Sequence, residues 1–321
     1  MAELKDKVQN ALDEARMLVL GSQVLLGFQF KSALETGFDK LPVATQYLKM
    51  GGLSLLVFTL ALLMAPAPFH QLVEKGEDTL TLHRYATGLM RIALLPFAVA
   101  LGIDAYAAGE KLGGFGLGLA MGAAVGGAAL FFWYGLEAID RVRHAPHVEE
   151  RRQMDRDTKN EPTELKTKIK QVLTEARVVL PGAQALLGFQ FIAMIMDGFE
   201  KLPESSKYVH LACLGLVALS TILLMTPAAY HRIVEQGEET EHFHRFSSRI
   251  LLAAMVPLAL GVCGDVYVVL LKVTKVPSVA VGLALALLAV CYGLWFGYTL
   301  AQRAGRERSR TASRSSERLT T

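Results

Sequence analysis

The sequence predicts an all-α integral membrane protein with eight transmembrane helices, arranged as two parallel four-helix repeats. Three observations support this fold class: long runs without charged residues, an internal repeat at a constant spacing, and an uneven placement of lysine and arginine. Of the 321 residues, 52% are hydrophobic and 20% are charged. Soluble domains carry about 25% charged residues, so this composition favours a chain that is surrounded largely by lipid.

The chain repeats itself with an offset of 161 residues, and the alignment of the two copies needs no gap. The segment LLGFQF at 25–30 recurs at 186–191, and APAPFHQLVEKGE at 65–77 recurs as TPAAYHRIVEQGE at 226–238. Self-similarity at a fixed spacing over most of a chain is typical of repeated structural units. The sequence therefore indicates a tandem fusion of two copies of one unit.

We predict a first membrane repeat at 1–141 and a second at 163–302, joined by a charged cytoplasmic linker at 142–162. The remaining tail at 303–321 is rich in arginine, serine and threonine. A polar and basic segment of this kind buries too little apolar surface to offset the entropy lost on ordering. We therefore expect the tail to be disordered.

Eight stretches are candidates for crossing the bilayer, because about 20 apolar residues span its hydrocarbon core. Five contain no Asp, Glu, Lys or Arg: 50–73, 112–136, 178–196, 208–230 and 276–302. Three contain charge: the stretch from Met17, which includes Lys31, and the stretches 91–104 and 249–265. The repeat supports these three, since the first has an uncharged counterpart and the other two match each other.

A short amphipathic segment precedes the first span of each repeat, and we expect it to lie along the cytoplasmic interface. Four spans per repeat place both termini, the linker and two His-bearing loops on one side of the membrane. That side carries 24 lysines and arginines and the opposite side carries 7, with Lys49 counted among the latter. Positively charged loops stay in the cytoplasm, which predicts that both termini are cytoplasmic.

Several short motifs resemble a family of small bacterial four-helix membrane proteins that is described as a domain of unknown function. The motifs are E-A-R, G-x-Q-x-L-L-G-F, G-F-x-K-L and L-L-M-x-P-A-x-[FY]-H. They are carried by Glu14, Gln23, Phe28, Phe38, Pro66 and His70 in the first copy, and by Glu175, Gln184, Phe189, Phe199, Pro227, His231 and Arg232 in the second. The first copy has Gln71 where the second has Arg232. The resemblance implies two four-helix units in a bacterial inner (cytoplasmic) membrane and supplies no activity.

The two His-bearing loops carry residues that bind metals in other proteins. They contain His70, Glu74 and His83 in the first copy, and His231, Arg232, Glu235 and His244 in the second. Imidazole and carboxylate groups are plausible metal ligands. The spacing H-x3-E-x8-H matches no established metal motif, so the alternative is that these side chains lie in the headgroup region.

Four polar residues recur within the apolar stretches: Asp104 with Asp265, and Gln23 with Gln184. An ionisable residue within a span costs about 2.5–3.5 kcal/mol on insertion scales and often marks an ion or proton path. Asp104 and Asp265 each follow a proline by eight residues, so a kinked helix could expose them to such a path. The alternative is that they lie at the outer interface and meet water or a nearby lysine. Hydrogen bonds between helices are a sufficient explanation of the glutamines, and a contact with a ligand is the alternative.

A strip of glycines, Gly114, Gly118, Gly122 and Gly126, occurs in the fourth predicted span of the first repeat only. Small residues at this spacing let two helix backbones approach closely. The sequence leaves open whether the partner is the other half of the chain or another subunit.

The sequence favours a non-enzymatic helical module that packs with partner subunits or lipids. An ion or solute transporter that uses Asp104 and Asp265 is the alternative, and a metal- or redox-active protein that uses the His loops is a weaker one. We expect no cofactor and no nucleic-acid partner. Anionic lipid headgroups near the basic linker and tail are the expected ligands, and a homo-oligomer or another membrane partner remains open.

Overall fold

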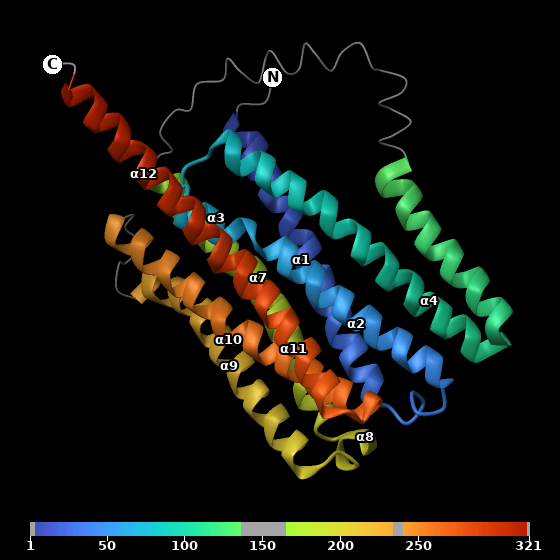
Figure 1. The fold of residues 1–321 in the computed structure, drawn as a ribbon. Coiled ribbons are helices and arrows are strands. Elements are labelled where there is room, and N and C mark those ends of the chain that lie inside the picture. Colours follow the sequence, from blue (N-terminus) through green and yellow to red (C-terminus); the bar gives the residue numbers. More distant parts are fainter. Residues whose placement is uncertain (1–3, 136–164, 234–239, 320–321) are drawn as a thin grey trace.

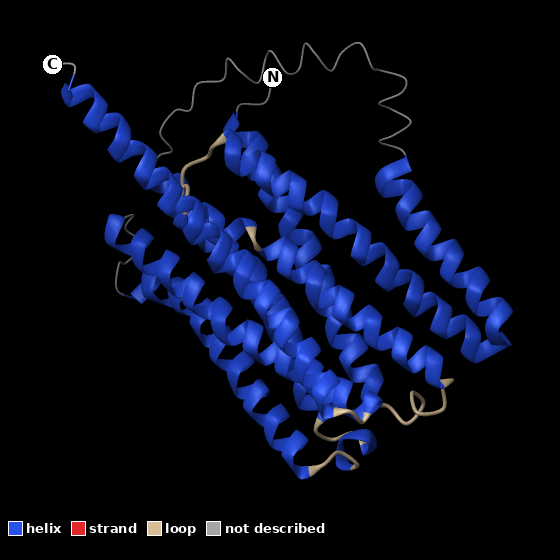
Figure 2. Cartoon of the chain, in the orientation of Figure 1, coloured by secondary structure: helices blue, strands red, loops and turns tan. Residues whose placement is uncertain are grey.

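The computed structural model describes residues 4–135, 165–233 and 240–319. Within these ranges all regular secondary structure is helical (Figure 2). The first repeat contains α1 (Leu4–Leu34), α2 (Val43–Met64), α3 (Pro66–Leu72), α4 (Leu80–Leu130) and the π-helix η1 (Phe131–Gly135). The second contains α7 (Leu165–Ala193), α8 (Asp197–Glu200), α9 (Glu204–Ile233), α10 (Glu241–Thr274), α11 (Pro277–Tyr292), the π-helix η3 (Gly293–Gly297) and α12 (Tyr298–Leu319).

The long helix α4 reverses direction at two glycines, so that it forms a helical hairpin (Figure 1). Gly113 has φ −137° and ψ 17°, and Gly114 has φ 76° and ψ −171°. Positive φ favours glycine, which has no Cβ. In the second repeat the same turn is made by Lys275, with φ 56°, and Pro277 then begins α11. Gly114 and Lys275 are repeat equivalents, which explains Gly114 as a turn residue.

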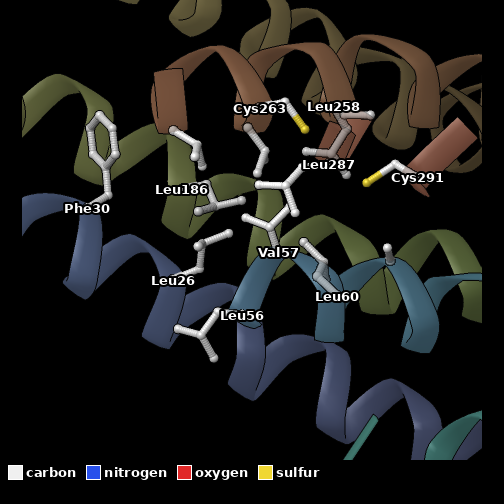
Figure 3. Packing of buried hydrophobic residues seen from close by; sticks show 14 of the residues in the cluster. Leu26, Phe30, Leu56, Val57, Leu60, Leu186, Leu258, Cys263, Leu287 and Cys291 are labelled. Carbon is white, nitrogen blue, oxygen red and sulfur yellow. The ribbon is translucent and has the colours of Figure 1, made fainter. Parts of the chain in front are cut away.

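The two repeats share one hydrophobic core, and α1 and α7, the first long helix of each repeat, lie against each other along it. Phe28 and Phe189 meet there with ring centroids 4.7 Å apart. Figure 3 shows how side chains from both repeats interdigitate, with Leu26 and Val57 beside Leu186. The repeats are therefore one bundle held by apolar packing, in addition to the covalent linker.

The last helices of the two repeats are placed differently. In the second repeat, α11 and η3 pack against α2 of the first, and Trp295 Nε1 donates to the Ala61 carbonyl at 2.8 Å. In the first repeat, the returning arm of α4 lies at the edge of the bundle (Figure 1). Large apolar side chains on this arm and on η1, which continues it, stay exposed, including Phe115 at 66% and Phe132 at 63%. The repeat in sequence thus produces an asymmetric bundle.

Seven helices in the described part of the chain are long and apolar enough to cross a membrane, as expected of a multi-pass membrane protein. They cover Glu14–Leu34, Val43–Leu72, Leu80–Gly135, Thr167–Ala193, Glu204–Ala228, Glu241–Thr274 and Pro277–Arg308. We predicted eight spans. The numbers differ because the third of these helices, Leu80–Gly135, includes two of the predicted spans, 91–104 and, except for its last residue, 112–136. Its 56 residues would extend about 84 Å if straight, far more than the ~30 Å hydrocarbon core, and they include the reversal at Gly113 and Gly114.

Two expectations about the ends of the repeats are corrected. The amphipathic segments do not form separate interfacial helices, because α1 and α7 each continue without a break into an apolar span. The tail expected to be disordered continues as α12 to Leu319 and projects beyond the bundle (Figure 1). Helical spacing in α12 places Arg303 four residues before Glu307, where they pair at 3.1 Å, and such pairs favour a helix. The predicted linker at 142–162 lies outside the described residues.

Candidate functional site: two buried acid–base clusters

The second repeat contains a buried cluster made by His210 of α9, Asp265 of α10 and Gln190 of α7. His210 Nδ1 lies 2.8 Å from Asp265 Oδ1, and the Gln190 side-chain amide donates to Asp265 Oδ2. The residues are 0%, 6% and 2% exposed, respectively. The cluster lies three to nine residues from the ends of its helices, which is about 5–14 Å along the helix axis. These are the ends opposite the chain termini.

The two nitrogens of His210 both face oxygen atoms. Nδ1 faces Asp265, and Nε2 lies 3.1 Å from the Gln190 carbonyl oxygen, which can only accept a hydrogen bond. A proton is therefore needed on Nε2 and another between Nδ1 and the Asp265 carboxylate. The imidazole ring also stacks on Phe30 of the first repeat and meets the edge of Phe199. These aromatic neighbours exclude water, which strengthens the interaction between the imidazole and the carboxylate.

The first repeat contains a cluster of the same design, made by Lys49 of α2, Asp104 of α4 and Gln29 of α1. Lys49 Nζ lies 2.5 Å from Asp104 Oδ1, and Gln29 Nε2 donates to Asp104 Oδ2 at 2.6 Å. This pair is less enclosed, since the side chains of Lys49 and Asp104 are 12% and 22% exposed. The lysine and the carboxylate together leave the cluster with no net charge.

The two clusters occupy equivalent positions of the repeat, because all three residues are related by the offset of 161. Gln29 corresponds to Gln190, Asp104 to Asp265, and the base changes from Lys49 to His210. Each cluster thus joins the first, second and third long helices of its own repeat. The carboxylate and the amide are the same in both copies, and only the chemistry of the base differs.

A small cavity adjoins the second cluster at the interface between the repeats. Asp265 and Gln190 line it together with apolar side chains that include Leu26, Phe30 and Leu186. Its volume is about 20 Å³, which is enough for one water molecule when polar partners are present. Gln190 Oε1 is buried and has no hydrogen-bond partner in the described part of the protein. The cavity therefore offers room for a polar guest beside the carboxylate.

Sequence reasoning identified both aspartates and missed both bases. Asp104 does meet a nearby lysine, one of the alternatives considered. This residue, Lys49, is half-buried in α2, whereas we counted it among the lysines on the outer side of the membrane. His210 was overlooked because its stretch contains no Asp, Glu, Lys or Arg. The signal that could have found them is the repeat itself, which aligns Lys49 with His210.

The two predicted glutamines have different surroundings. The side chain of Gln23 on α1 is fully buried against α7. A Cβ on Gly182 of α7 would lie 1.6 Å from Gln23 Oε1. Neither amide atom of Gln23 has a hydrogen-bond partner among the described residues. Gln184 is exposed. The repeat therefore does not give these two residues a shared contact.

The His-bearing loops do not gather their predicted residues into one site. His70 and His244 are buried, His83 is half-buried, and Glu74 pairs with Arg306 of α12 at 2.7 Å. Among the residues that the structure describes, no group of three His, Cys, Asp or Glu side chains is placed to hold a metal ion. The side chains of His231 and Arg232, and all of Glu235, lie outside the described residues.

The glycine strip packs within its own repeat, against the first arm of α4. A Cβ on Gly118 would lie 3.0 Å from the Tyr106 carbonyl oxygen, and one on Gly122 would lie 3.0 Å from the Gly102 carbonyl oxygen. Gly126 lies against Gly102 as well. The close partner is therefore the preceding helical arm, which neither of the alternatives considered from sequence included.

Comparison with known proteins identifies the repeat unit and no activity. No curated protein and no solved structure matches the chain. The profile of the Family of unknown function (DUF6328) matches twice, at residues 3–137 and 158–299. The two matches begin 155 residues apart and end 162 residues apart, close to the offset of 161, and each match includes one of the two acid–base clusters. The chain therefore belongs to the Family of unknown function (DUF6328), with two copies of the family unit in tandem.

Proposed function

We propose that the protein is a non-enzymatic ion or solute transporter that binds and releases a proton at the His210–Asp265–Gln190 cluster. The observation that carries this proposal is the buried imidazole–carboxylate pair, in which both nitrogens of His210 face oxygen atoms. Histidine changes its charge between pH 5 and pH 8, whereas lysine stays protonated there. The second repeat thus holds the proton-exchanging site, and Lys49–Asp104 is a fixed ion pair.

Energetics support a functional role for these pairs. An ionisable side chain within a membrane span costs about 2.5–3.5 kcal/mol on insertion scales. A buried ion pair seldom stabilises a protein more than apolar side chains of the same volume would. A bundle selected only for stability would therefore gain little from two such clusters. A site that must take up a proton needs both an acid and a base away from bulk water.

The proposal includes the topology expected from the sequence. We propose eight crossings, with the two arms of α4 counted as two, in a bacterial inner membrane with both termini cytoplasmic. The excess of lysine and arginine on the terminus side supports this orientation. The acid–base clusters then lie near the periplasmic ends of the helices, and a proton from that side has only one or two helical turns to travel.

Proton movement can be tested in vesicles that contain the purified protein and a trapped pH-sensitive dye. After an imposed pH gradient, with valinomycin and K⁺ to balance charge, the wild type should change the internal pH faster than empty vesicles. Pulses of Na⁺, K⁺ or Ca²⁺ test exchange of a cation for protons. Asp265→Asn should abolish the protein-dependent rate, and Asp104→Asn should reduce it less. Gln184→Leu, at an exposed position, is the control. Equal rates in wild type and Asp265→Asn would contradict the proposal.

A packing module remains a second candidate, because one observation favours it. The returning arm of α4 and the π-helix η1 that continues it expose large apolar side chains, including Phe115, Leu119 and Phe132. A membrane partner or a second copy could cover this arm, and the buried ion pairs would then specify the helix arrangement. Co-purification at native expression levels in a mild detergent tests this function. A monomer without partners would count against it.

A further inference from the structure

A large polar cavity lies at the terminus end of the bundle, and its lining residues on α10 are about 20–36 Å from Asp265 along the helix. Its volume is about 820 Å³, within the range of small-molecule sites. The wall is formed by the loop after α3, the start of α4, Lys168 of α7, the first turns of α10, and α12. Both repeats and the tail helix therefore contribute to one cavity.

The cavity carries a surplus of positive charge. Six cationic side chains line it: Lys75, Lys168, Arg245, Arg249, Arg303 and Arg306. Four carboxylates line it as well: Glu74, Glu77, Glu241 and Glu307. Among the residues that the structure describes, these counts leave a surplus of two positive charges, which makes the cavity attractive to an anion and unattractive to a cation.

Most of the carboxylates are already engaged by neighbouring cations. Glu74 forms a bidentate pair with Arg306 at 2.7 and 2.9 Å, and Glu77 pairs with Lys168 at 2.5 Å. Glu307 pairs with Arg303 within α12 at 3.1 Å. The first two pairs join the loop of the first repeat to helices of the second, so they help to fix the shape of the wall.

Two of the cations line the cavity without such a pair. Lys75 and Arg249 are exposed, and neither has a carboxylate within 4.0 Å among the described residues. Lys75 has a left-handed backbone with φ 53°, which non-glycine residues adopt rarely and at a cost of roughly 1–2 kcal/mol. Lys75 lines the cavity, and a Cβ on the neighbouring Gly76 would lie 3.0 Å from His244 Nε2 of α10. The two cations thus approach the cavity from different repeats.

Part of the cavity wall is apolar, which indicates how a ligand is oriented. Leu72, Val73 and Leu252 line it beside the charged groups, close to the ends of helices whose middle sections are apolar enough to span a membrane. A cationic wall next to an apolar wall suits an amphiphile with an anionic headgroup. Basic pockets between helices at the cytoplasmic face are a known mode of binding for anionic headgroups.

We propose that this cavity binds a phosphate ester, with Lys75 and Arg249 as the two groups that neutralise its charge. Arginine and lysine both bind phosphate, arginine through two parallel hydrogen bonds and lysine as a point charge. The ester comes either from a phospholipid headgroup, with its acyl chains along Leu72, Val73 and Leu252, or from a soluble molecule. The site is independent of the proton cluster, so its test is separate from that of the transport proposal.

Binding can be measured by native mass spectrometry of the full-length protein in detergent. Phosphatidylglycerol is the anionic probe, phosphatidylcholine the zwitterionic control, and calorimetry with glycerol 3-phosphate tests the soluble source. Each cation at a membrane surface contributes about 1 kcal/mol, or roughly fivefold in affinity. The double variant Lys75→Gln/Arg249→Gln should therefore bind phosphatidylglycerol about 25-fold more weakly than the wild type.

The matched control is Arg84→Gln/Arg308→Gln, which removes the same charge from exposed residues that do not line the cavity. It should bind as the wild type does, and both variants should keep the wild-type melting temperature. Binding of phosphatidylglycerol alone identifies a lipid site, and equal binding of glycerol 3-phosphate identifies the phosphate ester itself as sufficient. Either result supports the proposal. It is overturned if the double variant binds as well as the control, or if neither anionic probe binds better than phosphatidylcholine.

Discussion

Lys49 and His210 stand at the same position of the two repeats, 161 residues apart, and each places a nitrogen against the carboxylate of the equivalent aspartate. A duplicated unit has therefore kept its acid and changed its base. The change matters because lysine holds its proton at physiological pH and histidine does not always do so. The two halves of the bundle consequently differ in chemistry where their folds are most alike.

The carboxylates should differ in how much stability their loss costs. Asp265→Asn leaves His210 buried without a charged partner, and breaking a buried ion pair costs about 3–5 kcal/mol. Asp104→Asn should cost less, because its pair with Lys49 is partly exposed, and exposed pairs contribute about 0–1 kcal/mol. Unfolding of the purified protein in detergent, followed by circular dichroism, compares the two. A larger loss of unfolding free energy for Asp104→Asn than for Asp265→Asn would contradict the finding that Asp265 is the more deeply buried carboxylate.

Exchange of the bases should transfer the pH response from one repeat to the other. The folded cluster holds a proton between His210 and Asp265, so the folded state binds more protons than the unfolded state near neutral pH. Stability contributed by the pair therefore falls as the pH rises from 5 to 8. His210→Lys should remove this part of the pH dependence. Lys49→His should add a second pH-dependent contribution to stability, from the first repeat. The measurement is the unfolding midpoint of each variant and of the wild type between pH 5 and 8. Comparison with the wild type removes the contribution of the other histidines, which all three proteins share.

Gly198 and Gly37 are repeat equivalents with different surroundings, which makes them a matched pair. A Cβ on Gly198 would lie 1.8 Å from the Leu34 carbonyl oxygen, an atom of the backbone that cannot swing away. On Gly37 the nearest atom within 4 Å is Lys111 Nζ at 3.2 Å, the end of a flexible side chain. Gly198→Ala should therefore cost about 1–3 kcal/mol, and Gly37→Ala less than about 0.5 kcal/mol. Equal melting temperatures for the two variants would refute this packing of α8 against α1.

The hairpin of α4 should depend on Gly122 and tolerate changes at Gly116. A side chain at Gly122 would meet Tyr106 Cβ at 2.9 Å and the Gly102 carbonyl oxygen at 3.0 Å, whereas Gly116 faces open space. Gly122→Leu should separate the two arms and lower the unfolding free energy by about 1–3 kcal/mol. Gly116→Leu should leave it within about 0.5 kcal/mol of wild type. The same thermal measurement distinguishes them, and no difference between them would rule out the close approach.

Much of the architecture could be predicted from the sequence, because lipid restricts a spanning chain to few solutions. The offset of 161 defined the repeat unit, charge-free runs located the long helices, and two aspartates within apolar stretches located the clusters along their helices. Each inference uses information that is local or repeated. A residue's depth along a helix follows from counting residues at 1.5 Å each.

Only the tertiary structure decided which side chains meet. Gln190, His210 and Asp265 are brought together from three helices, and periodicity gives little help, because a helix that is apolar on all sides does not reveal which side faces protein and which faces lipid. For the same reason, three other features could not be predicted from the sequence: the partner of Gly122, the exposed position of the returning arm, and the pairing of Glu74 with Arg306 across the repeats. Sequence by itself determined where the long apolar helices lie and their order along the chain, and helix packing determined which side chains form the sites.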